Sequence, residues 1–65
     1  MKVIFYMPFK KELEISGGKT VKKLAEELKF SLESNVVLKN GKMVTPDEMV
    51  NDEDTVEILS AISGG

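Results

Sequence analysis

The last two residues, Gly64 and Gly65, are the part of this 65-residue chain best suited to chemistry. Glycine has no Cβ, so a Gly-Gly end is narrow and flexible enough to enter a channel that any side chain would block. The reactive group that such an end offers is its terminal carboxylate. A frayed terminus is the competing interpretation, because chain ends are commonly disordered.

Few other residues of the chain could perform catalysis. It contains nine lysines and eleven carboxylates, but no histidine, cysteine or arginine. This composition excludes histidine or thiolate metal sites and nucleophile–histidine pairs. We therefore expect no catalytic residue and no metal site in this protein, which is not expected to be an enzyme acting alone.

Length and charge further restrict the kinds of partner and location that this protein can have. A net charge of −2 argues against nucleic acid as a partner, because phosphate binding normally requires a basic surplus. No signal peptide and no apolar segment long enough to span a bilayer is present, so we expect a cytoplasmic protein without a membrane partner. The length predicts one small domain, residues 1–62, followed by a tail, residues 63–65.

The first third of the chain predicts a hairpin of two strands. Residues 2–7 are rich in β-branched and aromatic side chains, and residues 10–15 alternate between apolar and charged positions. Both patterns are typical of strands. Pro8 and Phe9 provide the bend between them.

A helix is predicted after the break at residues 16–18. Thr20 is well placed to cap its N-terminus. One apolar stripe follows at helical spacing and should face the sheet. The stripe consists of Val21, Leu24, Ala25 and Leu28. The charged residues on the opposite side are interpreted as a solvated face.

Three further strands are predicted in the second half. Asn40 and Gly41 form a strong two-residue turn signal, because both tolerate a positive φ. The predicted strands are residues 36–38, 42–44 and 55–62.

Between the last two of these strands lies an acidic loop, residues 45–54. We expect it to be held by Pro46 and by a buried Met49 or Val50. Its carboxylates lack the spacing and central glycine of an EF-hand, so a solvated loop is expected rather than a cation site. They are Asp47, Glu48, Asp52, Glu53 and Asp54.

The element order ββαβββ predicts an α+β fold, with one helix on one face of a mixed sheet of four to five strands. The first and last strands are the most apolar. A central parallel pairing of these two would bury them best.

Alternation along these two strands also predicts an apolar patch. If Val3 and Val56 face the helix, then Ile4, Tyr6 and Leu59 share the outer face of the sheet, with Leu38 a further candidate. Exposed apolar patches commonly mark interaction sites. The alternative is a slip of one residue in register, which would place these side chains in the core.

The chain resembles the ubiquitin-like β-grasp family, and most closely its sulfur-carrier branch, which includes the ThiS-like and MoaD-like carriers and the small archaeal modifiers. The resemblance rests on the helix opening at Thr20 and Val21, residues 37–44, residues 54–59, and Ser63 with the two terminal glycines. Glu53 departs from the glycine common before the last strand in this family. The absence of an arginine next to the glycines favours a carrier or archaeal modifier over ubiquitin itself.

The resemblance implies that a partner enzyme uses ATP and Mg²⁺ to adenylate the carboxylate of Gly65. Sulfide transfer would then give a thiocarboxylate that donates sulfur to thiamine, molybdopterin or tRNA thiolation through a sulfur-accepting enzyme. Gly64 and Ser63 would provide reach, while Ile62 and Ala61 would anchor the tail beside the outer-face patch.

Two alternatives stay open at this point. In the first, lysines of target proteins attack the adenylate, and an isopeptide bond joins the protein to them as a modifier. In the second, the protein is a binding module or enzyme subunit whose tail enters a partner without covalent chemistry.

Overall fold

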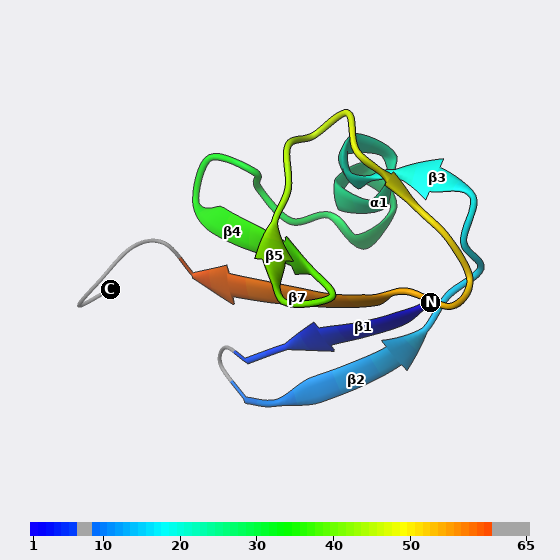
Figure 1. The fold of residues 1–65 in the computed structure, drawn as a ribbon. Helices are drawn as coiled ribbons and strands as arrows, with labels where there is room; N and C mark the ends of the chain where they lie inside the picture. The colour runs from blue at the N-terminus through cyan, green and yellow to red at the C-terminus, as the bar shows by residue number, and fades with distance from the viewer. Residues whose placement is uncertain (7–8, 61–65) are drawn as a thin grey trace.

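The computed structural model of the protein describes residues 1–6 and 9–60. Within these residues the chain forms seven strands and one helix (Figure 1). The helix is α1, Val21–Leu28. The strands are β1 (Lys2–Phe5), β2 (Lys11–Glu14), β3 (Lys19–Thr20), β4 (Asn35–Lys39), β5 (Lys42–Met43), β6 (Met49–Val50) and β7 (Thr55–Ser60).

The main sheet has β1 and β7 at its centre. In the described part of the chain, five strands pair in the order β2-β1-β7-β4-β5. β1 and β7 run parallel, with Val3 opposite Val56 and Phe5 opposite Ile58. The other pairs of this sheet are antiparallel. The predicted central parallel pairing is therefore confirmed.

The hydrophobic core lies between this sheet and α1, which crosses one face of it (Figure 1). Val3 and Val56 are both 0% exposed, as is Leu24 of the helix. Burying such a side chain contributes roughly 1.5–3 kcal/mol. At one end of the core the rings of Phe5 and Phe30 meet edge to face, with centroids 5.9 Å apart.

The helix forms where the sequence predicts it. The side chain of Thr20 accepts a hydrogen bond from the backbone N–H of Lys23 and so caps the first turn. Val21, Leu24 and Ala25 are buried, and Leu28 packs against the core as a half-buried side chain. The helix ends at Leu28, and the C-cap residue Lys29 has a φ of 60°, in the left-handed region.

The turn between β4 and β5 is also as predicted. Asn40 has a φ of 53° and Gly41 a φ of 85°, the pair of positive values that a type I′ hairpin turn requires. Asn40 also joins this turn to the start of β7. Its side-chain carbonyl accepts a hydrogen bond from the N–H of Thr55, and its side-chain N–H₂ donates to Asp54.

A second, two-stranded sheet formed by β3 and β6 was not expected from the sequence. Thr20 lies opposite Met49, and Lys19 lies opposite Val50. The side chain of Val50 is 0% exposed, whereas Met49 is 49% exposed. Of the two residues proposed to hold the acidic loop, Val50 is the buried one and Met49 is not.

The strands are mostly shorter than the sequence suggested. β1 ends at Phe5, β2 covers Lys11–Glu14, and β5 has two residues. β4 is longer than predicted, since it extends over Asn35–Lys39. Met7, the last residue of the predicted first strand, and Pro8, one of the two residues of the predicted bend, lie outside the described residues.

Candidate functional site

β7 is the element that carries the predicted reactive end. It lies between β1 and β4, so its backbone is hydrogen-bonded on both sides. Val56 and Ile58 are buried toward the helix, and the strand ends at Ser60. The proposed tail residues lie beyond this point and outside the described residues. They are Ala61, Ile62, Ser63, Gly64 and Gly65.

The register of the central strands places the predicted docking residues on one face. Ile4 of β1 lies opposite Glu57 of β7, and Glu57 lies opposite Leu38 of β4. Leu59 lies opposite Val36 in the next row. Because paired residues project to the same side of a sheet, these side chains share the face that α1 does not cover.

The structure adds two residues to this group. Met43 lies opposite Leu38 in the β4–β5 pair, on the same outer face, and is 73% exposed. Val36 also lies on the outer face, because it pairs with Leu59. We call the resulting group the outer-face patch. It consists of Ile4, Tyr6, Val36, Leu38, Met43 and Leu59.

Within this patch, Met43 is the one side chain that is mostly exposed. Ile4, Tyr6, Leu38 and Leu59 are each half-buried by their neighbours on the sheet. The predicted exposed patch is therefore a closely spaced apolar surface with one projecting methionine. Alternation within β5 could have identified Met43, but two residues are too few for a periodic signal.

One polar contact crosses the patch. The Tyr6 hydroxyl donates a hydrogen bond of 2.5 Å to Oε2 of Glu57. This bond, together with the negative charge of Glu57, raises the pKa of the Tyr6 phenol above its ordinary value. The sequence analysis did not predict the bond between Tyr6 and Glu57.

Hydrogen bonds to its carboxylates hold the acidic loop in place. Asp52 accepts from the N–H of Gly17 at 2.6 Å, and Asp54 accepts from the N–H of Asn51 at 2.7 Å. Glu48 forms an ion pair with Lys39 at 2.8 Å. The described residues contain no cluster of three or more ligands that could hold a metal ion. These carboxylates organise the loop.

The charged face of the helix is solvent-facing, as predicted. Glu27 forms its ion pair with Lys19, at 2.8 Å, instead of with a lysine of the helix. This contact lowers the pKa of the Glu27 carboxyl. Among the described residues, no helix has the length and apolar character needed to cross a membrane.

Comparison with known proteins agrees with this architecture. The sequence matches the ThiS family over residues 5–65. It is 38% identical over 65 residues to the sulfur carrier protein TtuB of Thermus thermophilus, with 100% of both chains covered. The crystal structure of the thiamine biosynthesis protein ThiS from Geobacter metallireducens shares the fold, with a TM-score of 0.64, 24% identity and 100% of both chains covered. The predicted ubiquitin-like β-grasp fold is confirmed, and the chain belongs to the ThiS family.

Proposed function

We propose that this protein is a sulfur carrier whose Gly65 carboxylate is adenylated by a partner enzyme and then converted to a thiocarboxylate. The observation that carries the proposal is the family match, which extends through Gly64 and Gly65 to the last residue. A relative named as a sulfur carrier matches over the same full length. The protein is then the substrate of its partner, and the catalytic groups belong to the partner.

The chemistry requires two steps, because a carboxylate is a poor acyl donor. In the first, a carboxylate oxygen of Gly65 attacks the α-phosphorus of ATP held with Mg²⁺ by the partner, and pyrophosphate leaves. In the second, hydrosulfide attacks the acyl carbon, the bond to the adenylate oxygen breaks, and AMP and a proton are released. The product is a terminal thiocarboxylate, whose sulfur can be passed to an accepting enzyme.

The fold supports delivery of this end to a partner. β7 is paired with β1 as far as Ile58 and with β4 as far as Ser60. The five residues that follow Ser60 can span at most about 17 Å when fully extended. A partner that reacts with Gly65 must therefore contact the protein close to the end of β7. The outer-face patch includes Leu59 at that end, and we propose it as the docking surface.

The test is ATP–pyrophosphate exchange with candidate adenylating enzymes from the same organism. We expect exchange with the full-length protein and none with the protein lacking Gly65. Exchange that is independent of Gly65, or absent with every candidate enzyme, would contradict the proposal.

Matched variants test the docking surface in the same assay. Met43→Asp places a charge in the outer-face patch, and Phe9→Asp does the same at a site of similar exposure (77% against 73%) outside it. We expect Met43→Asp to raise the concentration for half-maximal exchange about tenfold, equivalent to ~1.4 kcal/mol. Phe9→Asp should leave it within about twofold. Equal effects of the two variants would exclude the patch as the docking surface.

A further inference from the structure

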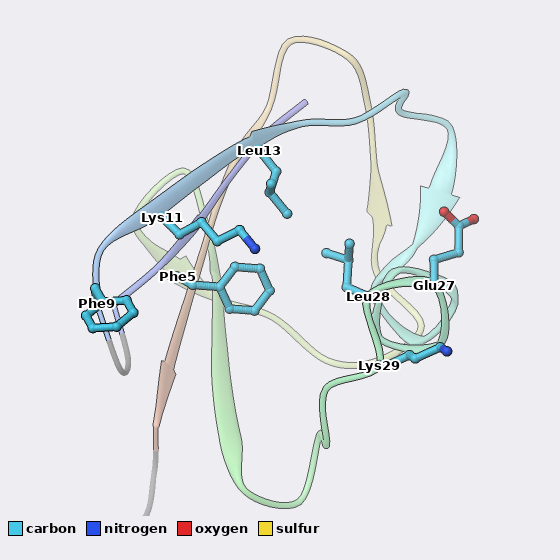
Figure 2. Close-up of a pocket in the computed structure, with 7 residues that line it drawn as sticks. All are labelled: Phe5, Phe9, Lys11, Leu13, Glu27, Leu28 and Lys29. Atoms are coloured by element: carbon cyan, nitrogen blue, oxygen red, sulfur yellow. The ribbon is translucent and has the colours of Figure 1, made fainter.

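An apolar groove lies on the other side of the sheet, between the β1–β2 hairpin and the end of the helix. Its volume is about 480 Å³. Figure 2 shows Phe5 and Leu13 projecting from the hairpin toward Leu28 of the helix, with Phe9 at the far end of the hairpin. Phe9 is 77% exposed, the largest value among the large apolar side chains of the described residues.

The groove is bordered by the free edge of a strand. β2 pairs with β1 alone in the described part of the chain. Met1 and Ile15 exchange two backbone hydrogen bonds, so the antiparallel alternation makes Leu13 and Lys11 the next bonded positions toward β1. The backbone N–H and C=O groups of Glu12 and Glu14 therefore point away from the sheet. They form a template on which another strand can pair.

Charged residues lie on both faces of this edge. Lys11 extends into the groove beside Phe5, and Glu27 and Lys29 line the groove on the side of the helix (Figure 2). No ion pair involves Lys11 among the described residues. On the opposite face of β2 lie Glu12 and Glu14. Glu12 forms long ion pairs with Lys2 and Lys10, at 4.0 and 3.9 Å, and Glu14 forms one of 3.6 Å with the N-terminal ammonium, while both carboxylates stay exposed. An added strand would thus meet apolar groups and an ammonium on one face and carboxylates on the other.

This pattern disfavours a second copy of the chain as the added strand. Antiparallel pairing of β2 with its own copy brings residues on the same face opposite each other. A register centred on Glu12 places that glutamate opposite its own copy, and a register centred on Leu13 places Glu12 opposite Glu14. A register centred on Lys11 places that lysine opposite its own copy. Like charges directly opposite destabilise a strand pair.

We propose that the free edge of β2 and the adjoining groove bind an extended segment of a partner protein by strand addition. The segment alternates between two kinds of residue. Apolar side chains enter the groove over Phe5, Leu13 and Leu28, with one carboxylate reaching Lys11. Lysine or arginine side chains on its other face meet Glu12 and Glu14. Backbone bonds to the edge supply affinity, and the alternating side chains supply specificity. The groove lies on the other face of the sheet from the outer-face patch, and Glu12, which lies opposite Ile4, borders that patch.

The probes are two acetylated and amidated heptapeptides, KVKVKDK and its reverse order KDKVKVK, which cover antiparallel and parallel addition. Each is titrated into the isotopically labelled full-length protein while backbone amide signals are followed by NMR. We expect at least one peptide to shift the signals of residues 11–14 and 28–30 and to slow hydrogen exchange at the amides of Glu12 and Glu14. A peptide of the same charge, N-methylated at alternate residues so that it cannot pair, controls for non-specific attraction to an acidic protein.

Paired variants distinguish strand addition from peptide binding that does not involve backbone pairing. Glu12→Pro removes an N–H that faces the free edge and takes no part in the bonds to β1, a position where proline is tolerated. We expect it to weaken peptide binding about tenfold or more, whereas Glu12→Ala changes binding less than about threefold. Phe9→Ser should weaken binding several-fold, and Met43→Ser, on the other face at similar exposure, should not.

The results of these peptide-binding experiments test the strand-addition proposal independently of sulfur carriage. Absence of shifts at β2 with both peptides at millimolar concentration would overturn it. So would shifts confined to the outer-face patch, equal binding of the N-methylated control, or undiminished binding to Glu12→Pro. Because deletion of Gly65 is expected to leave peptide binding unchanged, a failure of adenylation and a failure of strand addition are read separately.

Discussion

The Tyr6 hydroxyl donates a 2.5 Å hydrogen bond to Oε2 of Glu57, linking the residue after β1 to the middle of β7. The two residues lie 51 positions apart in the chain. The bond crosses the outer-face patch and ties together the two central strands, one of which leads to the end that we propose to be reactive. A charged carboxylate is thereby held within an otherwise apolar surface.

The first prediction concerns titration of this pair. Tyr6 is the single tyrosine of a chain without tryptophan, so its phenolate absorbance reports one group. Its pKa is raised by the bond to Glu57 and by the charge of that carboxylate. We expect the folded protein to titrate with a midpoint above 10.0. Spectrophotometric titration of the phenolate band measures this directly.

The sign of the linked stability effect follows from the raised pKa. The unfolded chain loses the phenolic proton at lower pH than the folded protein, so the contribution is fully present below about pH 10. It is lost as the pH rises through the folded pKa. Glu57→Gln removes the charge and should lower the midpoint. A midpoint identical in the parent protein and in this variant would rule out the Tyr6–Glu57 coupling.

The second prediction concerns the side chain of Asn40. Asn40→Gly keeps the positive φ that the turn requires but removes the hydrogen bonds to Asp54 and Thr55. We expect the free energy of unfolding to fall by about 1–2 kcal/mol, from the lost bonds and the added freedom of glycine. Urea denaturation measures the change. Gly41→Asn, which retains a residue tolerant of φ 85°, is the control and should cost less.

A third prediction is acid destabilisation through Asp54. The N–H of Asn51 and the side chain of Asn40 donate to this carboxylate and hold its pKa below 3.8. Its contribution is therefore present above the unfolded pKa and lost as the pH falls through the lower, folded value. We expect Asp54→Asn to lower stability at neutral pH and to flatten the loss between about pH 5 and 2. If the free energy of unfolding fell equally with pH in the variant and in the parent protein across that range, the prediction would be contradicted.

The fourth prediction concerns Gly17, which precedes β3 and lies against the backbone of the acidic loop. A Cβ at this position would lie 2.3 Å from the backbone carbonyl carbon of Asn51 and from the backbone nitrogen of Asp52. Gly17→Ala must therefore shift backbone, at a cost of about 1–3 kcal/mol. Gly18→Asn is the matched control, because Gly18 has open space around it and asparagine tolerates its φ of 80°. Thermal unfolding should rank Gly17→Ala as the less stable variant.

The central sheet could be predicted because its signals are local and strong. The two most apolar strands contain Val3 and Val56, and burying both faces of each places them at the centre. Thr20 and the stripe after it predicted the helix, and Asn40 with Gly41 predicted the turn. In each case a few neighbouring residues fix the local conformation.

The β3–β6 sheet could not be predicted in this way. Two-residue strands such as Lys19–Thr20 and Met49–Val50 are too short to show alternation. Their pairing depends on contacts across about thirty positions in the chain, which include Gly17 against Asp52. That arrangement also decides that Val50 is buried and that Met49 is exposed.

Only some residues of the outer-face patch could be predicted from the sequence, for a related reason. Alternation placed Ile4, Tyr6 and Leu59 together, because the parallel pairing of β1 and β7 fixes which side chains share a face. Met43 depends on the register of β5 against β4, which the turn geometry sets. The Tyr6–Glu57 bond depends on side-chain conformation across two strands, which a periodic pattern does not encode.

The most direct test of sulfur carriage is the intact mass of the protein isolated from its native cells. The account predicts a population heavier than the unmodified chain by the difference between one sulfur and one oxygen atom, with the change located at Gly65 by fragmentation. Treatment with an alkylating reagent should label that population at the same residue. A protein that carries only an unmodified carboxylate under conditions of active sulfur transfer, or is found only in isopeptide linkage to lysines of other proteins, would contradict the account.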